Sequence, residues 1–542
     1  MNRATGWKSL IFAAAFAGAG LAQVRVQDLL QGPNENWVTY AGSYDGKRHS
    51  PLTQITPENA GNLTAKWVFH VQQTRRLECT PLVYDGIMYV TNSNEIYALD
   101  ARTGRQIWTY RDETVKAQRV NRGPALLGDK VYFVTSDANL VALNRKTGAL
   151  YWSKQYADPK KGYFGSAAPF AAKDKIIVGV GGGDSGMRGF LAAMNAETGE
   201  EVWKTYTVPA RGEPGSETWG DLTIDWGGAG TWLSGTYDPE LNTLFWTTGN
   251  PWPDFYAGHR PGDNLWSDSL VAFDLDTGKM KWHFQFTPRD VWDWDAQSWP
   301  ILIDMPWEGK PRKLVFHANR NGFFYALDRT NGKFLRATRL AELITWAKGI
   351  DPVTGRPDVV PGMEPNASGK EVCPSVRGVT NWMSQSYDSK LGLYFVPTLE
   401  QCDVYTSSAK TPEPMKGFAG TGGEQIPARP GKFYMRAFDP KTGNKAWEYP
   451  MTGEAKMWAG VVSTASGVLL FGDDDGQLVA LESKTGKHLW HFNTGQGLTA
   501  SPITFAVDGK QYVTIATQTD VMTFGLFEPV RATPLVKERV ED

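Results

Sequence analysis

Three aspartates, Asp290, Asp293 and Asp295, stand among large aromatic residues in the stretch 289–296, which reads RDVWDWDA. A buried carboxylate without a partner takes up a proton, so acids in such surroundings need a reason to stay charged. Residues two apart on an extended strand point the same way, so Asp293 and Asp295 could face one site together. The stretch is either an acidic turn between strands or a set of oxygens that shares a cation.

A glycine-rich stretch, residues 181–186 (GGGDSG), follows an apolar strand and matches Gly-x-Gly-x-x-Gly. The chain then forms a hairpin that ends at Trp203, which leaves no room for the crossover helix of a dinucleotide-binding fold. The stretch is therefore a flexible turn, or backbone that approaches a ligand closely while Asp184 offers a carboxylate.

Asn250 lies before a proline in residues 247–253, where turn chemistry is the ordinary interpretation. If it faces the same site, the oxygens of four residues form a set suited to a hard cation: Asp184, Asn250, Asp293 and Asp295.

The elements that must position these groups are visible as a repeat. A strand ends in Ala-Leu or Ala-Phe, Asp-x-x-Thr-Gly forms a hairpin turn, and a second strand ends in Trp. Copies begin at positions 98, 142, 193, 272, 326, 437 and 480, and the copy at 326 has lost its tryptophan. Such periods predict a β-propeller, with tryptophans wedged between blades. The 22 tryptophans and 57 glycines also favour an all-β fold.

The N-terminus supplies an eighth outer strand at residues 63–67, and the strands after Trp490 lack one. We therefore expect an all-β, eight-bladed β-propeller with tryptophan-docking repeats, formed as a single domain by residues 23–542. Its N-terminal strand would complete the last blade. The long interval 326–437 would hold an insertion.

Residues 1–22 are typical of an export signal, with Arg3 and Lys8 before an apolar run at 9–21 and small residues at its end. The run is too short for a comfortable membrane span. We therefore expect a periplasmic protein that begins near Gln23, and no cysteine follows Ala22 to anchor it to lipid. The formal net charge of −2 provides no basic surface for nucleic acid or an anionic membrane.

Three cysteines in an oxidising compartment predict one disulfide and one remaining thiol. Cys373 and Cys402 lie 29 residues apart in one segment and are the expected pair. Cys79 is the remaining thiol; it is interpreted as a small buried apolar residue without an assigned role.

The tryptophan-ended repeats, together with GNP at 249–251, PGDN at 261–264, TPRDVWD at 287–293 and NRNG at 319–322, resemble the pyrroloquinoline quinone (PQQ)-dependent alcohol dehydrogenases. That family is an eight-bladed propeller typified by methanol dehydrogenase. The resemblance spans roughly the whole mature chain, and it implies an enzyme that oxidises small alcohols to aldehydes by hydride transfer to PQQ.

The resemblance also implies roles for individual residues. Asp293 matches the catalytic aspartate, which takes the alcohol proton, and Arg320 matches the cation beside the reactive carbonyl. The positions that match metal ligands are Asp184, Asn250, Asp293 and Asp295, and the metal would act as a Lewis acid on the quinone. The positions that match cofactor contacts are Glu78, Arg122, Ser166, Gly182, Gly183, Trp232, Arg320, Asn381 and Trp458. The spacing of Cys373 and Cys402 resembles a structural disulfide of the family.

Departures from the family pattern concern the metal and the cofactor cover. Calcium-dependent members tend to have alanine at the place of Asp295, whereas lanthanide-dependent members have a second aspartate there. An extra carboxylate suits a trivalent ion of calcium-like size, so a lanthanide is expected and Ca²⁺ is the alternative. Asp184 stands in place of a glutamate. Lys116 and Ala117 stand where members commonly carry two adjacent cysteines.

The electron acceptor would be a separate soluble cytochrome c, since no Cys-x-x-Cys-His motif attaches a haem to this chain. A homodimer is compatible with the sequence. A non-catalytic envelope propeller scaffold is the rival interpretation. It explains the tryptophans but not the grouping of Asp184, Asn250, Asp293, Asp295 and Arg320.

Overall fold

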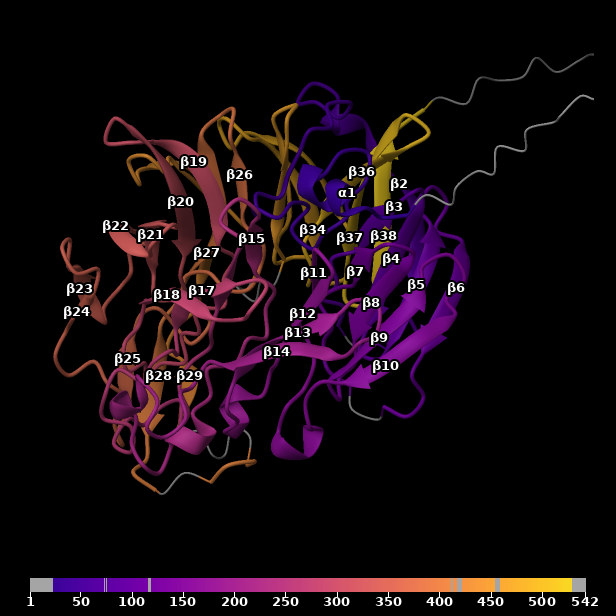
Figure 1. The fold of residues 1–542 in the computed structure, drawn as a ribbon. Coiled ribbons are helices and arrows are strands. Elements are labelled where there is room, and N and C mark those ends of the chain that lie inside the picture. The colour runs from indigo at the N-terminus through magenta and orange to yellow at the C-terminus, as the bar shows by residue number, and fades with distance from the viewer. Residues whose placement is uncertain are drawn as a thin grey trace, which may run out of the picture.

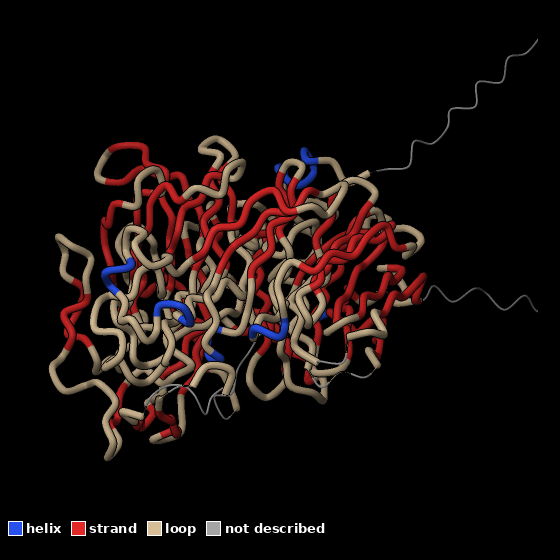
Figure 2. Tube along the Cα trace, turned by 60° about the horizontal axis from the view of Figure 1, so that its bottom comes forward, coloured by secondary structure: helices blue, strands red, loops and turns tan. Residues whose placement is uncertain are grey.

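The computed structural model describes residues 23–72, 74, 76–115, 118–410, 413–416, 422–453 and 459–528. Strands make up most of the regular structure, and the helices are short (Figure 2). They are α1 (Val26–Gln31) and the 3₁₀ turns η1 (Ala60–Asn62), η2 (Pro159–Lys161), η3 (Gly183–Ser185), η4 (Ser216–Thr218) and η5 (Ile224–Trp226). Among these described residues, none of the helices is long and apolar enough to cross a membrane.

Within the described ranges, eight sheets have four or five strands each, antiparallel except for the parallel pairing of β1 with β32. Four sheets come first along the chain: β3 (Leu82–Tyr84), β4 (Ile87–Asn92), β5 (Glu95–Asp100), β6 (Gln106–Arg111); β7 (Ala125–Leu127), β8 (Lys130–Val134), β9 (Asn139–Asn144), β10 (Leu150–Gln155); β11 (Phe170–Ala172), β12 (Lys175–Gly179), β13 (Phe190–Asn195), β14 (Glu201–Tyr206); β15 (Thr236–Asp238), β16 (Thr243–Thr247), β17 (Ser269–Asp274), β18 (Met280–Gln285).

The remaining sheets follow in order: β19 (Ile301–Trp307), β20 (Lys310–Ala318), β21 (Phe323–Asp328), β22 (Lys333–Arg339); β26 (Ser386–Asp388), β27 (Leu393–Glu400), β30 (Lys432–Phe438), β31 (Lys445–Pro450); β1 (His49–Ser50), β32 (Val461–Thr464), β33 (Val468–Gly472), β34 (Gln477–Glu482), β35 (His488–Asn493); β36 (Ile503–Val507), β37 (Lys510–Ala516), β38 (Asp520–Leu526), β2 (Leu63–His70). The last sheet joins both ends of the chain, because β2 pairs antiparallel with β38 (Figure 1).

Burial differs between the inner and outer strands of a sheet. Strands in the second position, such as β8, β12 and β16, are buried along their whole length and carry nearly continuous apolar runs. Outermost strands, such as β10, expose alternate side chains. This pattern is expected for sheets that pack face to face on both sides and present only one edge to solvent.

The repeat forms the turn that its sequence predicts. In the β5–β6 hairpin the N–H of Gly104 donates to the carbonyl of Asp100, while the Asp100 carboxylate accepts the N–H groups of Arg102 and Thr103. Gly104 has a φ of +71°, which favours glycine. The side chain of the aspartate and the conformation of the glycine therefore explain why Asp-x-x-Thr-Gly recurs.

Most repeat tryptophans pack on the turn glycine of the next sheet. A Cβ at Gly148 would lie only 2.7 Å from the Trp108 ring, whose Nε1–H donates to the Arg145 carbonyl at 3.1 Å. The same ring-on-glycine contact joins Trp67 to Gly104, Trp152 to Gly199, Trp203 to Gly278, Trp282 to Gly332 and Trp447 to Gly486.

Where the repeat has lost its tryptophan, the contact is made differently. The guanidinium of Arg336 donates to the carbonyls of Pro440 and Lys441. Between the last two sheets the ring centroids of Trp490 and Phe524 lie 5.6 Å apart. Contacts therefore run from each sheet to the next and from the last back to the first, and the predicted all-β, propeller-type fold is confirmed.

Trp108→Ala should lower the free energy of unfolding by about 3–5 kcal/mol, because it removes a buried ring and its hydrogen bond between two sheets. Denaturant unfolding followed by circular dichroism measures this loss. Ile107→Ala is the control, since the side chain of Ile107 is 49% exposed and should cost little. Equal losses of unfolding free energy in the two variants would contradict a stabilising role of Trp108 between the two sheets.

The interval 326–437 contains the predicted insertion. It adds a two-stranded sheet of β23 (Ala347–Ile350) and β24 (Pro357–Val359), and a three-stranded sheet of β25 (Lys370–Val372), β28 (Asp403–Ser407) and β29 (Gly423–Pro427). In Figure 1 the first lies at the left edge and the second at the lower left.

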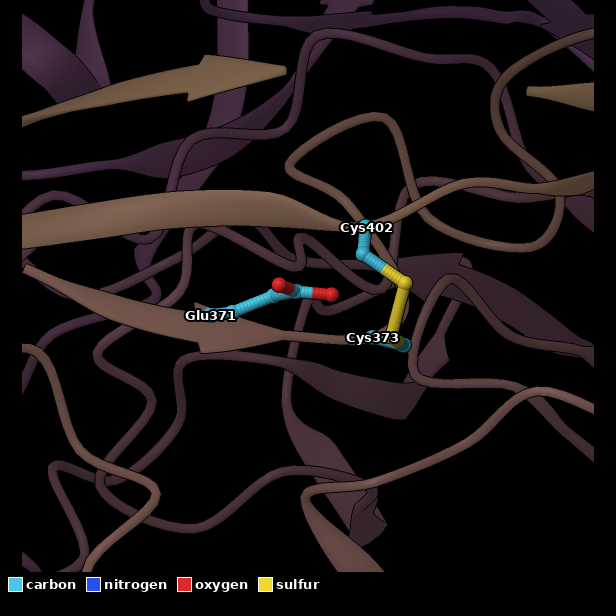
Figure 3. A group of neighbouring side chains, drawn as sticks. All are labelled: Glu371, Cys373 and Cys402. Carbon is cyan, nitrogen blue, oxygen red and sulfur yellow. A yellow bond between two sulfur atoms is a disulfide. The ribbon is translucent and has the colours of Figure 1, made fainter. Parts of the chain in front are cut away.

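The predicted disulfide between Cys373 and Cys402 is confirmed, and it ties the end of β25 to the start of β28. The Glu371 carboxylate lies beside it (Figure 3). Because both sulfurs are in the disulfide, this group offers no thiolate to a metal ion.

Cys79 is completely buried, and its Sγ accepts hydrogen bonds from the N–H and the hydroxyl of Thr91. Burial raises the pKa of the thiol to about 11. We expect no labelling of the native protein by a thiol reagent at pH 8, and one thiol per chain after denaturation without reductant. Labelling of the folded protein, or of three thiols after denaturation, would contradict the structure.

Candidate active site

The residues predicted to bind the cofactor and the metal lie at one end of the ring of sheets. Several of them precede the first strand of a sheet: Glu78, Arg122, Ser166, Trp232, Asp293, Asp295 and Asn381. Others follow the second strand: Asp184, Asn250 and Arg320. In an antiparallel sheet the start of the first strand and the end of the second meet at the same edge. The topology therefore gathers residues that are far apart in the sequence.

One half of the site is centred on Arg122. Its guanidinium contacts Glu78 Oε2 at 2.8 Å and donates to Ser166 Oγ at 3.1 Å. The Arg122 Cζ also lies 4.7 Å from the Trp232 ring centroid and 4.9 Å from that of Trp382. A fixed cation between indole rings suits a planar, anionic ligand. Sequence reasoning missed Trp382, although it directly follows the predicted contact Asn381.

The other half is centred on Arg320. It contacts Asp295 Oδ2 at 3.1 Å and donates to Asn381 Oδ1 at 3.0 Å and to the carbonyl of Asp293 at 2.8 Å. The Asp293 carboxylate lies further away, at 3.9 Å. The Arg320 Cζ is 5.9 Å from the Trp232 ring centroid, so Trp232 adjoins both arginines of the site.

Asp295 joins Arg320 to the loop that carries Asn250. Its Oδ1 accepts the N–H of Asn250 at 2.9 Å, and the indole N–H of Trp232 lies 3.5 Å away. A Cβ at Gly249 would lie 2.3 Å from this oxygen, so only glycine at that position lets the carboxylate approach. The interpretation of Asp295 as a solvated turn residue is excluded, because it is only 5% exposed.

The prediction that Asp293 and Asp295 share one face of a strand was wrong. Residues 290–299 form no strand, and Asp293 has a φ of +61°. Asp290 builds this turn, since its carboxylate accepts the N–H groups of Trp292 and Trp294. Both predicted ligands nevertheless reach Arg320, through a turn instead of a strand.

Asp184 lies in η3, directly after the predicted backbone contacts Gly182 and Gly183. Gly182 has a φ of +119°, and a Cβ there would lie 2.3 Å from the Gly162 carbonyl. Glycine at this position therefore lets two segments of the chain approach each other closely, and the approach of this backbone to a ligand stays a prediction. A Cβ at Gly183 would lie 3.8 Å from Asn250 Oδ1, so the two loops adjoin.

Electrostatics confirm that the acids are neighbours. Burial, followed by the negative charge of Asp295, raises the pKa of Asp184 to about 6. Burial also raises the pKa of Asp293 well above its usual range, with further contributions from Asp184, Asp295 and Asp254. Like charges gathered in a buried site are unfavourable unless a cation joins them.

Two buried acids were not found from the sequence. Both carboxylate oxygens of Asp254 and of Asp268 are buried and make no hydrogen bond of good geometry within the described residues, although the Asn250 side chain lies close enough to Asp254 to act on its pKa. Burial raises the pKa of each well above its usual range. Asp254 stands between Trp252 and the pair Phe255 and Tyr256, the same acid-among-aromatics signal that marked residues 289–296, so this signal could have found it.

The donor set fits a hard cation, because it consists of carboxylate and amide oxygens with a single arginine among them. Among the described residues, the oxygens of Asp184, Asp293 and Asp295 do not all lie within 4.8 Å of one another, so a shared ion requires side-chain movements. The predicted contact Trp458 and the positions Lys116 and Ala117 lie outside the described residues.

A catalytic propeller of the quinone-dependent class accounts for both the ring of sheets and the acids, arginines and indole rings gathered at its end. Comparison with known proteins gives the family. Residues 37–339 and 450–513 match the PQQ family described as glucose/ethanol/alcohol dehydrogenase, beta-propeller domain. The chain belongs to this family and is a PQQ-dependent alcohol dehydrogenase.

Relatives cover nearly the whole chain. The quinoprotein alcohol dehydrogenase PedH of Pseudomonas putida is 39% identical, over 94% of this chain and 90% of its own. The quinohemoprotein alcohol dehydrogenase ADH IIB of Pseudomonas putida is 38% identical, over 93% of this chain and 76% of its own.

Solved structures are similar in fold. A europium-containing methanol dehydrogenase has a TM-score of 0.85 and 30% identity, covering 92% of this chain and all of its own. The quinohemoprotein alcohol dehydrogenase ADHIIG of Pseudomonas putida HK5 has a TM-score of 0.87 and 33% identity, covering 94% of this chain and 84% of its own.

Proposed function

We propose that this PQQ-dependent alcohol dehydrogenase uses a lanthanide ion, held by Asp184, Asn250, Asp293 and Asp295. The observation that carries the proposal is Asp295, which is buried and joined to both Arg320 and the Asn250 backbone. This second carboxylate adds negative charge to a site that already contains Asp184 and Asp293. A trivalent ion gains more from that charge than a divalent ion does.

Bound PQQ supplies the hydride acceptor, and the bound metal ion supplies Lewis-acid polarisation. Residues of this chain hold the cofactor: Glu78, Arg122, Ser166, Gly182, Gly183, Trp232, Arg320, Asn381 and Trp458. In support, Glu78 and Ser166 both bind Arg122 and fix its guanidinium. A pre-oriented arginine recognises a carboxylate of the quinone at a lower entropy cost than a free one.

Asp293 accepts the hydroxyl proton of the alcohol in this proposal. Burial favours proton uptake on its carboxylate, and a bound cation opposes this and keeps the group available as a base. Arg320 stabilises negative charge that develops at the cofactor carbonyl. Its bond to Asn381 and its bond to the Asp293 carbonyl hold the guanidinium in place for this role.

We also propose the blade organisation of the domain, its location in the cell and its electron acceptor. We count each of the eight sheets as one blade, docked by tryptophans and closed by the N-terminal strand, in a domain of residues 23–542. With residues 1–22 as an export signal, the enzyme works in the periplasm. In this proposal a separate soluble cytochrome c accepts the electrons.

Ca²⁺ is the second candidate metal, favoured by the same all-oxygen donors. The test is alcohol-dependent dye reduction by purified protein supplied with PQQ and either La³⁺ or Ca²⁺. Activity with La³⁺ only supports the proposal. Activity with Ca²⁺ only would show that Ca²⁺, and not a lanthanide, is the metal of this enzyme. No activity with either metal across a broad alcohol panel would overturn the proposed function.

A further inference from the structure

Asp254 is a charged side chain that the proposed function does not use. It lies in the loop after β16, four residues beyond Asn250, and is 1% exposed. Both of its carboxylate oxygens are buried and make no hydrogen bond of good geometry within the described residues, although the Asn250 side chain lies close enough to act on its pKa. Burying a carboxylate in this way is costly, so the position needs a compensating charge.

Arg260 does not provide that compensation directly. Its guanidinium donates to the carbonyls of Pro253, Asp254 and Asp290 and to Asn264 Oδ1. These acceptors are carbonyl and amide oxygens, and none is the Asp254 carboxylate. Arg260 therefore acts on Asp254 through its charge alone, while its hydrogen bonds hold the backbone of this loop.

The surroundings of Asp254 contain the other acids of the metal site. Asp184 and Asp295 each act electrostatically on Asp254, and Asp254 acts in turn on Asp293. Asp254 thus lies within electrostatic reach of all three carboxylates that are proposed to hold the ion. Four carboxylates gathered beside Arg320 leave an excess of negative charge, which a multivalent cation would offset.

We propose that Asp254 supplies an additional carboxylate ligand to the metal ion. This inference rests on the proposed function, because it extends the set Asp184, Asn250, Asp293 and Asp295 by one residue. The buried Asp254 carboxylate would then belong to the ion's coordination shell, and its negative charge would make the site more selective for a trivalent ion.

Asp254→Asn tests this assignment, since it removes the charge while retaining the size of the side chain. The full-length protein is loaded with PQQ, stripped of metal with a chelator and titrated with LaCl₃ in competition with a chelator of known affinity. We expect La³⁺ affinity to weaken by at least about 10- to 100-fold, which is the range typical of residues that support metal ligands. Ca²⁺ binding should weaken by a smaller factor.

Asp268→Asn is the matched control. Asp268 is equally buried and unpartnered, and like Asp254 it is acted on by the charge of Asp295. It is not assigned to the ion, so its variant shows what the loss of a nearby buried charge does by itself. We expect La³⁺ affinity to change by less than about threefold. Without metal, Asp254→Asn should unfold at the same or a higher temperature than the unmodified protein, because a buried unpaired charge is gone.

Europium luminescence lifetimes in H₂O and D₂O provide a second readout, since they count the waters bound to the ion. Asp254→Asn should gain about one water, because a lost protein oxygen is replaced by solvent. Unchanged La³⁺ affinity and water count in Asp254→Asn, or an equal loss of affinity in Asp268→Asn, would overturn this inference alone. Failure of the unmodified protein to bind either metal would overturn it together with the proposed function.

Discussion

Asp295→Ala should abolish La³⁺-dependent alcohol oxidation, with kcat/KM falling by at least about 100-fold. The variant removes a buried carboxylate that contacts Arg320 at 3.1 Å and accepts the Asn250 N–H at 2.9 Å. The loss should be much larger with La³⁺ than with Ca²⁺, because the divalent ion depends less on the additional charge. Steady-state dye reduction with each metal gives the comparison.

Asp295→Asn separates charge from hydrogen bonding in that experiment. The amide oxygen still accepts the Asn250 N–H, so the loop remains held, whereas the negative charge is lost. We expect Asp295→Asn to resemble Asp295→Ala with La³⁺. If the asparagine variant kept full La³⁺ activity, Asp295 would position Arg320 and Asn250 without selecting the metal.

Asp293→Asn should lower kcat by about 10²- to 10⁴-fold, the contribution typical of a general base. KM should change far less, because the amide can still occupy the same space beside Arg320. Parallel measurement of La³⁺ affinity separates the loss of a base from the loss of a ligand. A large fall in kcat with metal bound is the expected result.

Asp403→Asn is the control for that variant. Asp403 is also buried, but its Oδ2 accepts the Val376 N–H beside the Cys373–Cys402 disulfide. We expect nearly unchanged kcat in this variant. Comparable kcat values for Asp293→Asn and the unmodified enzyme, measured with metal bound, would contradict the role of Asp293 as the base.

Much of the fold could be predicted because the repeat is local. Asp100 and Gly104 fix a hairpin through interactions within five residues, and Trp108 follows at a constant spacing. The insertion and the Cys373–Cys402 disulfide were likewise visible as an interrupted period that contains two cysteines. These features depend on short segments, so one sequence suffices to find them.

The site could be predicted only in part. Family resemblance located Glu78, Arg122, Asp295 and Arg320, which the structure brings together in pairs. The turn at Asp293 was missed because strand periodicity assumes extended backbone, and nothing local marks a φ of +61° there.

Asp254 and Asp268 were missed for a different reason. Whether an aspartate is buried without a partner depends on packing by distant segments, such as the loops that carry Asp184 and Asp290. Composition and spacing do not report such packing. Only the aromatic neighbours of Asp254 offered a hint.

The most direct test of the central claim is the position of the ion. Crystals of the full-length enzyme with PQQ and La³⁺ would give an anomalous difference map at a wavelength where lanthanum scatters. We predict one strong peak per chain among the oxygens of Asp184, Asn250, Asp293 and Asp295. The absence of a peak there, or a peak elsewhere in a crystal of active enzyme, would contradict the account.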